Sequence, residues 1–138
     1  MLLLDTHAWI WAAAGDKRVG ARTRRLLNRE AAAGRVFVSA MSAFEISALC
    51  TVGRLVLNQP VERWIRDSVV RGGLRVLDLD VGAAIDGGAL GHDLVPDPVD
   101  RLLIATARGA DMPLVTRDRR VLDFASRTRL VRVHDASR

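Results

Sequence analysis

The first residues of the chain join an apolar run directly to an acidic residue. Leu2, Leu3 and Leu4 precede Asp5. An apolar run this short, without alternation of polar and apolar residues, is typical of a strand buried on both faces of a parallel sheet. Ligands bind such sheets in the crevice beyond the carboxyl ends of the strands. Because Asp5 is the first polar residue at that end, it is the first candidate for a functional site.

Further apolar runs predict additional strands, separated by helices. Strands are expected over residues 36–38, 76–79 and 114–116, with an edge strand over 130–133. Helices are expected from residue 8, over 19–33, 43–53, 61–70, 81–90 and 98–109, and as a helical turn over 121–124. Strands that alternate with helices imply a mostly parallel sheet with helices on both faces. The sequence therefore predicts an α/β fold, with three α/β/α layers around a central sheet of four to five short strands.

Length and composition predict one globular domain that spans residues 1–138. Apolar residues make up 49% of the chain and charged residues 27%, which excludes a disordered chain. No apolar run approaches the roughly 20 residues that a membrane-spanning helix needs. Asp5 also interrupts the region where a signal peptide would need its apolar core. The single cysteine, Cys50, allows no internal disulfide, so we expect a protein of the reducing cytoplasm that does not bind membranes.

The chain carries an excess of basic residues, almost all of them arginines. Its formal net charge is +5, its pI is about 11.1, and only Lys17 among the 21 basic residues is a lysine. The helix expected over 19–33 is strongly basic, with Arg22, Arg25 and Arg29 among its residues. Arginine binds phosphate and carboxylate through a planar fork, and a basic surface favours nucleic acid or an acidic partner. This helix face is either solvated or a contact surface for nucleic acid or a protein partner.

Four acids are predicted to meet at the carboxyl edge of the sheet. Asp5 follows the first strand, and Asp118 follows the fourth strand by two residues. Glu45 lies on the helix after the second strand, and Asp100 lies in the first turn of the helix that leads into the fourth strand. Parallel strands all end at one edge, so helices that begin there bring their first turns to it. Asp97, three residues before Asp100, shares its helix face.

Such a cluster of carboxylates needs either protons or a cation, because like charges at close range resist ionising together. Oxygen ligands without a His/Cys pattern favour a hard ion such as Mg²⁺ or Mn²⁺. Such a metal polarises a phosphoryl oxygen and generates hydroxide from bound water, and a basic rim suits a phosphodiester substrate. Helix capping is the competing explanation: Asp16, Asp97 and Asp118 are adequate N-caps, and Ser42 with Glu45 has the spacing of a capping box.

Four ordered segments carry a resemblance to a known family. They are LLLDTHAWIW at 2–11, VSAMSAFEISALCTVGRL at 38–55, DPVDRLLIATA at 97–107 and LVTRDRRVLDF at 114–124. The chain resembles the PIN-domain ribonucleases and, within them, the VapC-type toxins of bacterial type II toxin–antitoxin systems. This resemblance implies a metal-dependent endoribonuclease that hydrolyses RNA phosphodiester bonds, forms a homodimer and is inhibited by a cognate antitoxin protein.

The resemblance also assigns roles to individual residues. The acidic quartet falls on Asp5, Glu45, Asp100 and Asp118. In this assignment Asp5 and Asp100 are the main ligands of Mg²⁺, with Mn²⁺ as the alternative ion. Glu45 and Asp118 complete the shell directly or through water, with one of them as general base. Thr116 matches a hydroxyl that shapes the pocket, Thr6 is a supporting residue, and Asp97 is an extra acid that is a ligand, a cap or a water-positioning group.

Three other interpretations compete with this one. A phosphoacceptor receiver domain needs an acidic pair after its first strand and a lysine at the end of a late strand, and the only lysine lies elsewhere. In a haloacid-dehalogenase-like phosphatase the position of His7 would be an acid. The remaining alternative is a non-catalytic RNA- or protein-binding module whose acids are helix caps. His7 and His92 are expected in packing or surface positions, and at least one of Trp9 and Trp11 in the core or a dimer contact.

Overall fold

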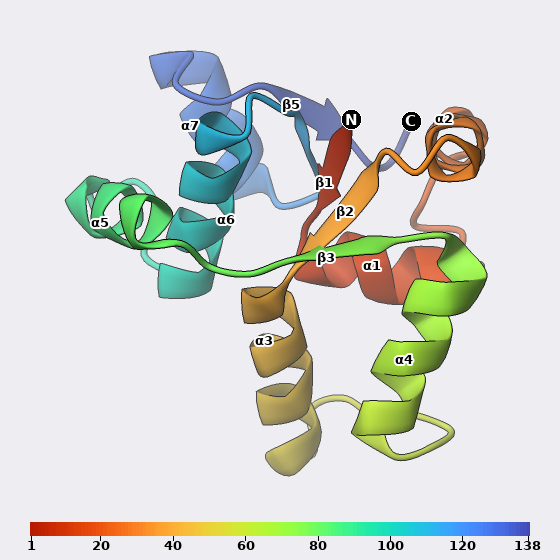
Figure 1. The fold of residues 1–138 in the computed structure, drawn as a ribbon. Helices are drawn as coiled ribbons and strands as arrows, with labels where there is room; N and C mark the ends of the chain where they lie inside the picture. Colours follow the sequence, from red (N-terminus) through yellow and green to blue (C-terminus); the bar gives the residue numbers. More distant parts are fainter.

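The computed structural model describes residues 1–138 and shows the predicted alternation of strands and helices (Figure 1). The strands are β1 (Leu2–Leu4), β2 (Val36–Ser39), β3 (Arg75–Leu77), β4 (Leu114–Thr116) and β5 (Val133–Asp135). The helices are α1 (Thr6–Ala13), α2 (Ala21–Ala32), α3 (Ala40–Thr51), α4 (Val61–Gly72), α5 (Val81–Ala89), α6 (Pro98–Gly109) and α7 (Arg119–Thr128). The predicted α/β fold class is confirmed.

All five strands form one parallel sheet in the order β3-β2-β1-β4-β5. The first strand is central, because Leu3 pairs with Phe37 of β2 on one side and with Leu114 of β4 on the other. The backbone N–H of Asp5 continues this ladder by donating to the carbonyl oxygen of Val115 at 3.0 Å. The carboxyl end of β1 therefore lies between the ends of its two neighbours, where crevices form in parallel sheets.

Helices cover both faces of the sheet and produce the three predicted layers. The helices α5, α6 and α7 lie on one face, and α1, α2 and α4 lie on the other (Figure 1). Successive side chains of β1 point to opposite faces of the sheet, so this strand contributes to both cores. Leu3 packs into the core beneath α6 and α7, while Leu2 and Leu4 pack beneath α1 and α2. The fifth strand lies at the sheet edge beside β4. Helix α3 starts at the carboxyl edge of β2 and projects away from the sheet alongside α4.

Several boundaries differ from those expected from the sequence. The edge strand occupies Val133–Asp135, not 130–133, because it is set by pairing with β4, which sequence periodicity does not reveal. The turn expected over 121–124 is a helix of ten residues, α7. Asp16 does not cap a helix: Gly20 is the N-cap of α2, and the Asp16 carboxylate instead accepts hydrogen bonds from the backbone and guanidinium of Arg18.

None of these helices is both long and apolar enough to cross a membrane. The longest helices have twelve residues, and α2 and α4 each carry several exposed arginines. This agrees with the apolar runs of the sequence, which fall short of a membrane span.

Candidate active site

Asp5 lies at the end of β1 and begins α1, so it is held by both elements. One of its carboxylate oxygens, Oδ1, accepts a hydrogen bond from the backbone N–H of Ala8 at 2.7 Å. The other oxygen accepts a hydrogen bond from the hydroxyl of Thr116, at the end of the neighbouring strand β4. Asp5 is only 8% exposed, and this burial raises its pKa more than the two hydrogen bonds lower it. A buried carboxyl at a sheet edge is therefore fixed in place but resists ionisation.

Thr116 joins Asp5 to the second predicted acid of the site. Its hydroxyl oxygen accepts a hydrogen bond from the backbone N–H of Asp118 at 3.0 Å while the hydroxyl donates to Asp5. Asp118 is the N-cap of α7, and its Oδ1 accepts hydrogen bonds from the backbone of Arg120 at 2.8 Å and Val121 at 3.4 Å. Its charge also raises the pKa of Asp5. The predicted cap is therefore present, and it holds Asp118 beside Asp5.

The start of α6 supplies two more acids. Asp97 is the N-cap, with its Oδ1 accepting from the backbone N–H of Val99 at 2.8 Å, and Pro98 follows at the first helical position. Asp100 lies in the first turn, and its side chain is half-buried and makes no hydrogen bond with another protein group. Its pKa rises to about 8, first through burial and then through the charges of four carboxylates, those of Asp97, Asp118, Asp5 and Glu45.

Glu45 comes from α3, and its position overturns one explanation offered from the sequence. The capping-box interpretation is wrong, because Ser39 caps α3 by accepting from the backbone N–H of Met41 at 3.0 Å. Ser42 lies inside the helix and accepts a hydrogen bond from the hydroxyl of Thr6 at 3.0 Å. This buried contact holds the start of α1 against α3, one turn before Glu45. The Glu45 carboxylate caps no helix, and its negative charge helps to raise the pKa of Asp100.

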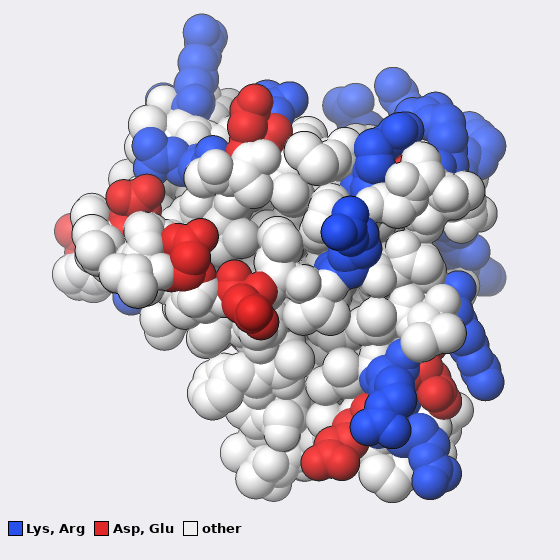
Figure 2. Space-filling view, in the orientation of Figure 1, with Lys and Arg blue, Asp and Glu red and all other residues white.

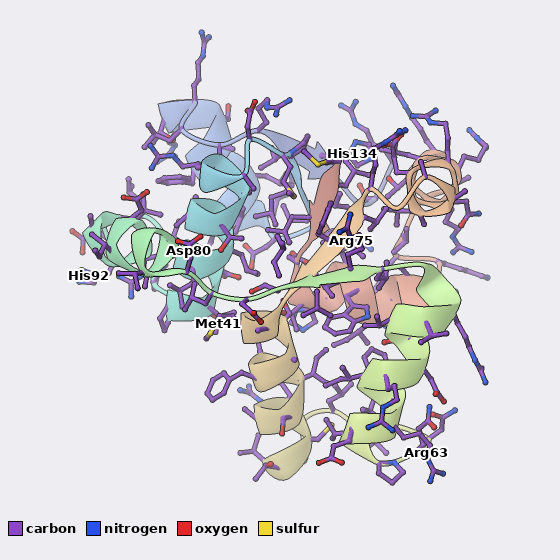
Figure 3. The ribbon with its side chains drawn as sticks, in the orientation of Figure 1. Met41, Arg63, Arg75, Asp80, His92 and His134 are labelled. Atoms are coloured by element: carbon purple, nitrogen blue, oxygen red, sulfur yellow. The ribbon has the colours of Figure 1, made fainter.

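The structure thus brings all four acids of the predicted quartet, together with Asp97, into one electrostatic neighbourhood. Asp100 is its centre, because the charges of the other four acids all raise its pKa. Figure 3 labels Met41 at the start of α3, the helix that carries Glu45, and Asp80 at the start of α5. No three His, Cys, Asp or Glu side chains converge closely enough to form a complete metal cage as they stand. Capping explains part of this, since Asp5, Asp97 and Asp118 each direct one oxygen to a helix N-terminus.

The donor set of this site nevertheless fits a hard divalent cation. All of its acidic groups offer oxygen, the ligand type that Mg²⁺ and Mn²⁺ prefer. An ionised carboxylate has about four lone-pair positions, so a capping oxygen retains capacity for an ion. The mutual repulsion that raises the pKa of Asp100 is relieved by either a proton or a bound cation. The chemistry and charge of the residues fit a metal, and closing the cage requires the side chains to move inward.

Four residues that sequence reasoning did not place in the site lie along the chain near Asp5 or contact one another there. His7 is exposed, lowers the pKa of Asp5 through its charge, and packs against Trp11 with ring centroids 5.5 Å apart. The guanidinium of Arg18 lies over the Trp11 ring at 4.5 Å. Arg117 donates from Nη1 to the backbone oxygen of Arg18 at 3.5 Å. The position of Arg117 between Thr116 and Asp118 was the only signal in the sequence that could have revealed it.

The remaining tryptophan and histidine side chains divide between the core and the surface. Trp9 is buried at 1% exposure and donates from Nε1 to the hydroxyl of Ser68 at 3.0 Å, so it is a core residue. Trp11 is half-buried and packs against His7, two residues after Asp5. His92 is exposed in the loop after α5, far from α1 and α3 in Figure 3, which confirms the expected surface position.

The acids of the site lie outside the main cavity between the helices. This cavity has a volume of about 400 Å³ and lies between α1, α2 and α4, where it is lined by Trp9, Trp64 and Arg71 among others. None of the five acids of the site lines it. Small-molecule ligands are usually enclosed in deep pockets. An acidic centre outside such a pocket is better suited to a polymer that lies across the surface.

Comparison with known proteins identifies relatives along nearly the whole chain. The PIN domain family model matches residues 2–127, a range that includes all five acids of the site. Ribonuclease VapC22 from Mycobacterium tuberculosis is 31% identical over 120 residues, which cover 87% of this chain and 88% of that protein.

Solved structures share the fold over a similar length. A chain in the crystal structure of VapBC2 from Rickettsia felis, bound to a DNA fragment from its promoter, has a TM-score of 0.70 and 16% identity and covers 96% of both chains. A chain in the DNA-bound VapBC structure from Salmonella typhimurium has a TM-score of 0.64 and 24% identity, covering 97% of this chain and 96% of that one. At these identities the similarity establishes the fold.

Proposed function

The chain belongs to the PIN domain family, among its VapC-type toxins, and from this premise we propose that it is a metal-dependent endoribonuclease, the toxin of a type II toxin–antitoxin pair. The observation that carries the proposal is the gathering of five carboxylates at the carboxyl edge of the sheet, and their mutual repulsion helps to raise the pKa of Asp100. A relative named as a ribonuclease supports the reaction class. A gathering of acids in a chain of net charge +5 supports a cation as their partner.

In this proposal Asp5 and Asp100 hold Mg²⁺ or Mn²⁺, and Glu45 and Asp118 complete the shell directly or through water. A divalent ion at this position would polarise a phosphoryl oxygen and lower the pKa of a bound water. The protein's own residues orient the ligands. Thr116 holds Asp5 and the backbone of Asp118 at the same time, so that it fixes the spacing between two of the acids. Glu45 or Asp118 accepts the proton of the attacking water as general base.

The proposed partners are RNA, an antitoxin protein and a second copy of the chain. RNA loops are the expected targets, because their bases are accessible to a protein. Solved relatives are described as VapBC and toxin–antitoxin complexes, which supports an antitoxin as inhibitor. We expect the protein to act in the cytoplasm, with residues 1–138 forming a single domain. The competing function is a non-catalytic binding module in which the acids serve only as caps.

Cleavage of labelled total RNA by purified, antitoxin-free protein tests the proposal. We expect discrete cuts in the presence of Mg²⁺, loss of cutting when EDTA removes the ion, and recovery when excess Mg²⁺ or Mn²⁺ is returned. Calorimetry with Mg²⁺ should show binding in the same preparation. A folded protein that neither binds Mg²⁺ nor cuts RNA would support the binding module. Cutting that is undiminished in EDTA would contradict the metal-dependent reaction.

Exposed apolar side chains make a second prediction about self-association. Phe44 on α3 is 63% exposed, and Ile85 on α5 is 66% exposed, although both helices pack against α6. We propose that these two side chains belong to one apolar surface, which association removes from water. We expect wild-type protein to elute as a dimer in size-exclusion chromatography with light scattering, and Phe44→Glu to shift it to monomer. Val56→Glu, at the 89%-exposed Val56 outside the helices, is the control and should leave the dimer intact.

A further inference from the structure

The outward face of α2 presents a row of arginines. Arg22, Arg25 and Arg29 are all exposed and are spaced three and four residues apart, which places them on one face of the helix. With a rise of about 1.5 Å per residue, the row is about 10 Å long. Figure 2 shows Lys and Arg side chains gathered over α2 at the upper right of the molecule, with few acids among them.

Most of this positive charge has no acidic partner within the protein. Arg22 and Arg25 form no ion pair and no hydrogen bond. Arg29 contacts Glu30 at 3.3 Å, but Glu30 also binds Arg35 at 2.8 Å and lies 3.6 Å from the amino terminus. Glu30 is the only acid in α2, so it cannot neutralise the row. By contrast, Arg24 turns inward to the backbone oxygens of residues 16 and 19, where it serves the fold.

The row lines a recess and is not a flat surface. A cavity of about 290 Å³ is bounded by the three arginines together with Leu26 and His134. His134 comes from β5, and its Nε2 lies 2.8 Å from the hydroxyl of Thr23, which fixes the ring against α2. Figure 3 shows His134 on the side of α2 that faces the sheet. Burial lowers the pKa of His134 most, and the charges of Arg138 and Arg22 lower it further.

Basic residues also connect the recess to the acidic centre. Arg117 lies between Thr116 and Asp118 and contacts the backbone of Arg18. Arg18 stacks on Trp11 and precedes α2 by a few residues. The backbone N–H of Thr23, in the first turn of α2, donates to the carbonyl of Arg138 at 2.9 Å, so the start of α2 and the carboxyl end of the chain adjoin. Arg18 is paired with the Asp16 carboxylate at 2.7 Å, so the segment between the acidic centre and α2 is aromatic and carries paired charge, while the free guanidinium groups begin at Arg22.

We propose that this arginine recess, lined by Arg22, Arg25, Arg29 and His134, binds the phosphodiester backbone of single-stranded RNA that flanks the cleaved bond. The inference rests on the proposed function, because it places a second contact for the same substrate. Guanidinium groups match phosphate through two parallel hydrogen bonds. Three arginines along about 10 Å suit a strand with regularly spaced phosphates better than they suit one small anion. The recess contributes affinity for long RNA and does not touch the reacting bond.

Binding to unstructured RNA of two lengths tests the proposal. The probes are fluorescent oligouridines of about 16 and about 4 nucleotides, the two ends of the range of site sizes of OB folds on single strands, with EDTA present to keep them intact. The variant is Arg22→Gln with Arg25→Gln. Its charge-matched control is Arg63→Gln with Arg66→Gln on α4, where both side chains are exposed and Arg63 lies far from α2 in Figure 3. Thermal melting confirms that each protein is folded.

We expect the α2 variant to bind the longer RNA about tenfold more weakly, since each arginine–phosphate pair is joined by charge-assisted hydrogen bonds. The slope of log K against log salt should become less steep by about 1.4, at about 0.7 for each phosphate of a single strand that the variant leaves without an arginine. The α4 control should retain the wild-type affinity and slope. Replacing the same two α2 residues by lysine should restore most of the salt slope, which a merely structural role of arginine would not explain.

Cleavage with Mg²⁺ separates this inference from the proposed function. The α2 variant should raise KM for a long RNA while leaving kcat, and the cutting of a short fragment with the same cleavage site, unchanged. If the wild type cuts RNA and the α2 variant matches it in KM and salt slope, the recess does not bind RNA. The proposed nuclease activity would still be supported. A variant that cuts RNA normally but escapes inhibition by antitoxin would assign the recess to a protein partner and overturn the proposal. Wild type that neither binds nor cuts RNA would overturn both.

Discussion

Replacing either Asp5 or Asp100 with asparagine is expected to lower RNA cleavage by about 10³-fold or more. Asparagine keeps the size and one oxygen of aspartate, but it removes the negative charge that would hold a divalent ion. Loss of one preorganised electrostatic group in an active site typically lowers kcat by about 10²–10³, and loss of a metal ligand adds the contribution of the ion. Both substitutions should therefore act on kcat in single-turnover cleavage with saturating Mg²⁺.

A matched control for these variants is Asp123→Asn. Asp123 is an exposed acid on α7, one turn from the Asp118 cap, and it makes no hydrogen bond or ion pair. Its replacement changes the net charge equally, so the control should retain wild-type cleavage. Circular dichroism should show the same helix content in all three variants. If Asp5→Asn or Asp100→Asn retained more than about a tenth of wild-type cleavage, the replaced acid would not be a metal ligand, and the proposed site would be wrong.

The fold was largely predictable because its strands are short and apolar on both faces. The runs at 2–4, 36–38 and 114–116 became β1, β2 and β4, the three strands at the centre of the sheet. The start of α6 was equally clear, since Asp97, Pro98 and Asp100 form a local pattern of cap, first-turn proline and first-turn acid. The gathering of acids followed from parallel topology alone. Local sequence signals and the geometry of a parallel sheet were therefore enough to predict the elements whose position depends on burial.

What the sequence did not reveal depends on contacts between distant segments. Both Ser39 and Ser42 fit the start of α3, and the choice of Ser39 follows the register of β2, while Ser42 is taken by Thr6 of α1. The contact between Arg117 and Arg18 joins residues almost a hundred positions apart. The assignment of roles within the acidic cluster likewise stays a prediction. An acid at the end of a strand or in the first turn of a helix can serve either as a cap or as a metal ligand, and its position in the sequence does not distinguish the two.

Without a metal ion, the protein is expected to lose stability as the pH rises from about 4 to about 8. The cause is Asp100, whose pKa is about 8 in the folded protein and has its ordinary value of 3.8 in the unfolded chain. Between these values the folded state holds a proton that the unfolded state has released. The folded state therefore binds more protons, so the free energy of unfolding falls with rising pH. Burial that raises the pKa of Asp5 acts in the same direction.

Comparison with Asp100→Asn isolates this effect from other titrating groups. The pKa of His134 is lowered by burial, which favours folding as the pH rises toward 6.5 and opposes the trend of Asp100. The pKa values of Asp16 and Glu30 are both lowered to about 2, so the stability that these carboxylates contribute is lost only when they are protonated in more acidic solution. These contributions are shared by wild type and variant. Because they cancel in the difference between the two proteins, that difference reports the carboxyl group of Asp100.

We expect Asp100→Asn to equal wild type in stability near pH 4 and to exceed it by about 2 kcal/mol at pH 8. A full shift is worth about 1.4 kcal/mol per pH unit, and water at this half-buried site screens much of it. Urea unfolding at both pH values with EDTA measures the difference. Mg²⁺ at pH 8 should stabilise wild type and leave the variant nearly unchanged, because a bound cation replaces the proton as the partner of these acids. A wild type that is more stable than Asp100→Asn at pH 8 without metal would show that Asp100 supports the fold, and the repulsion argued for this site would be wrong.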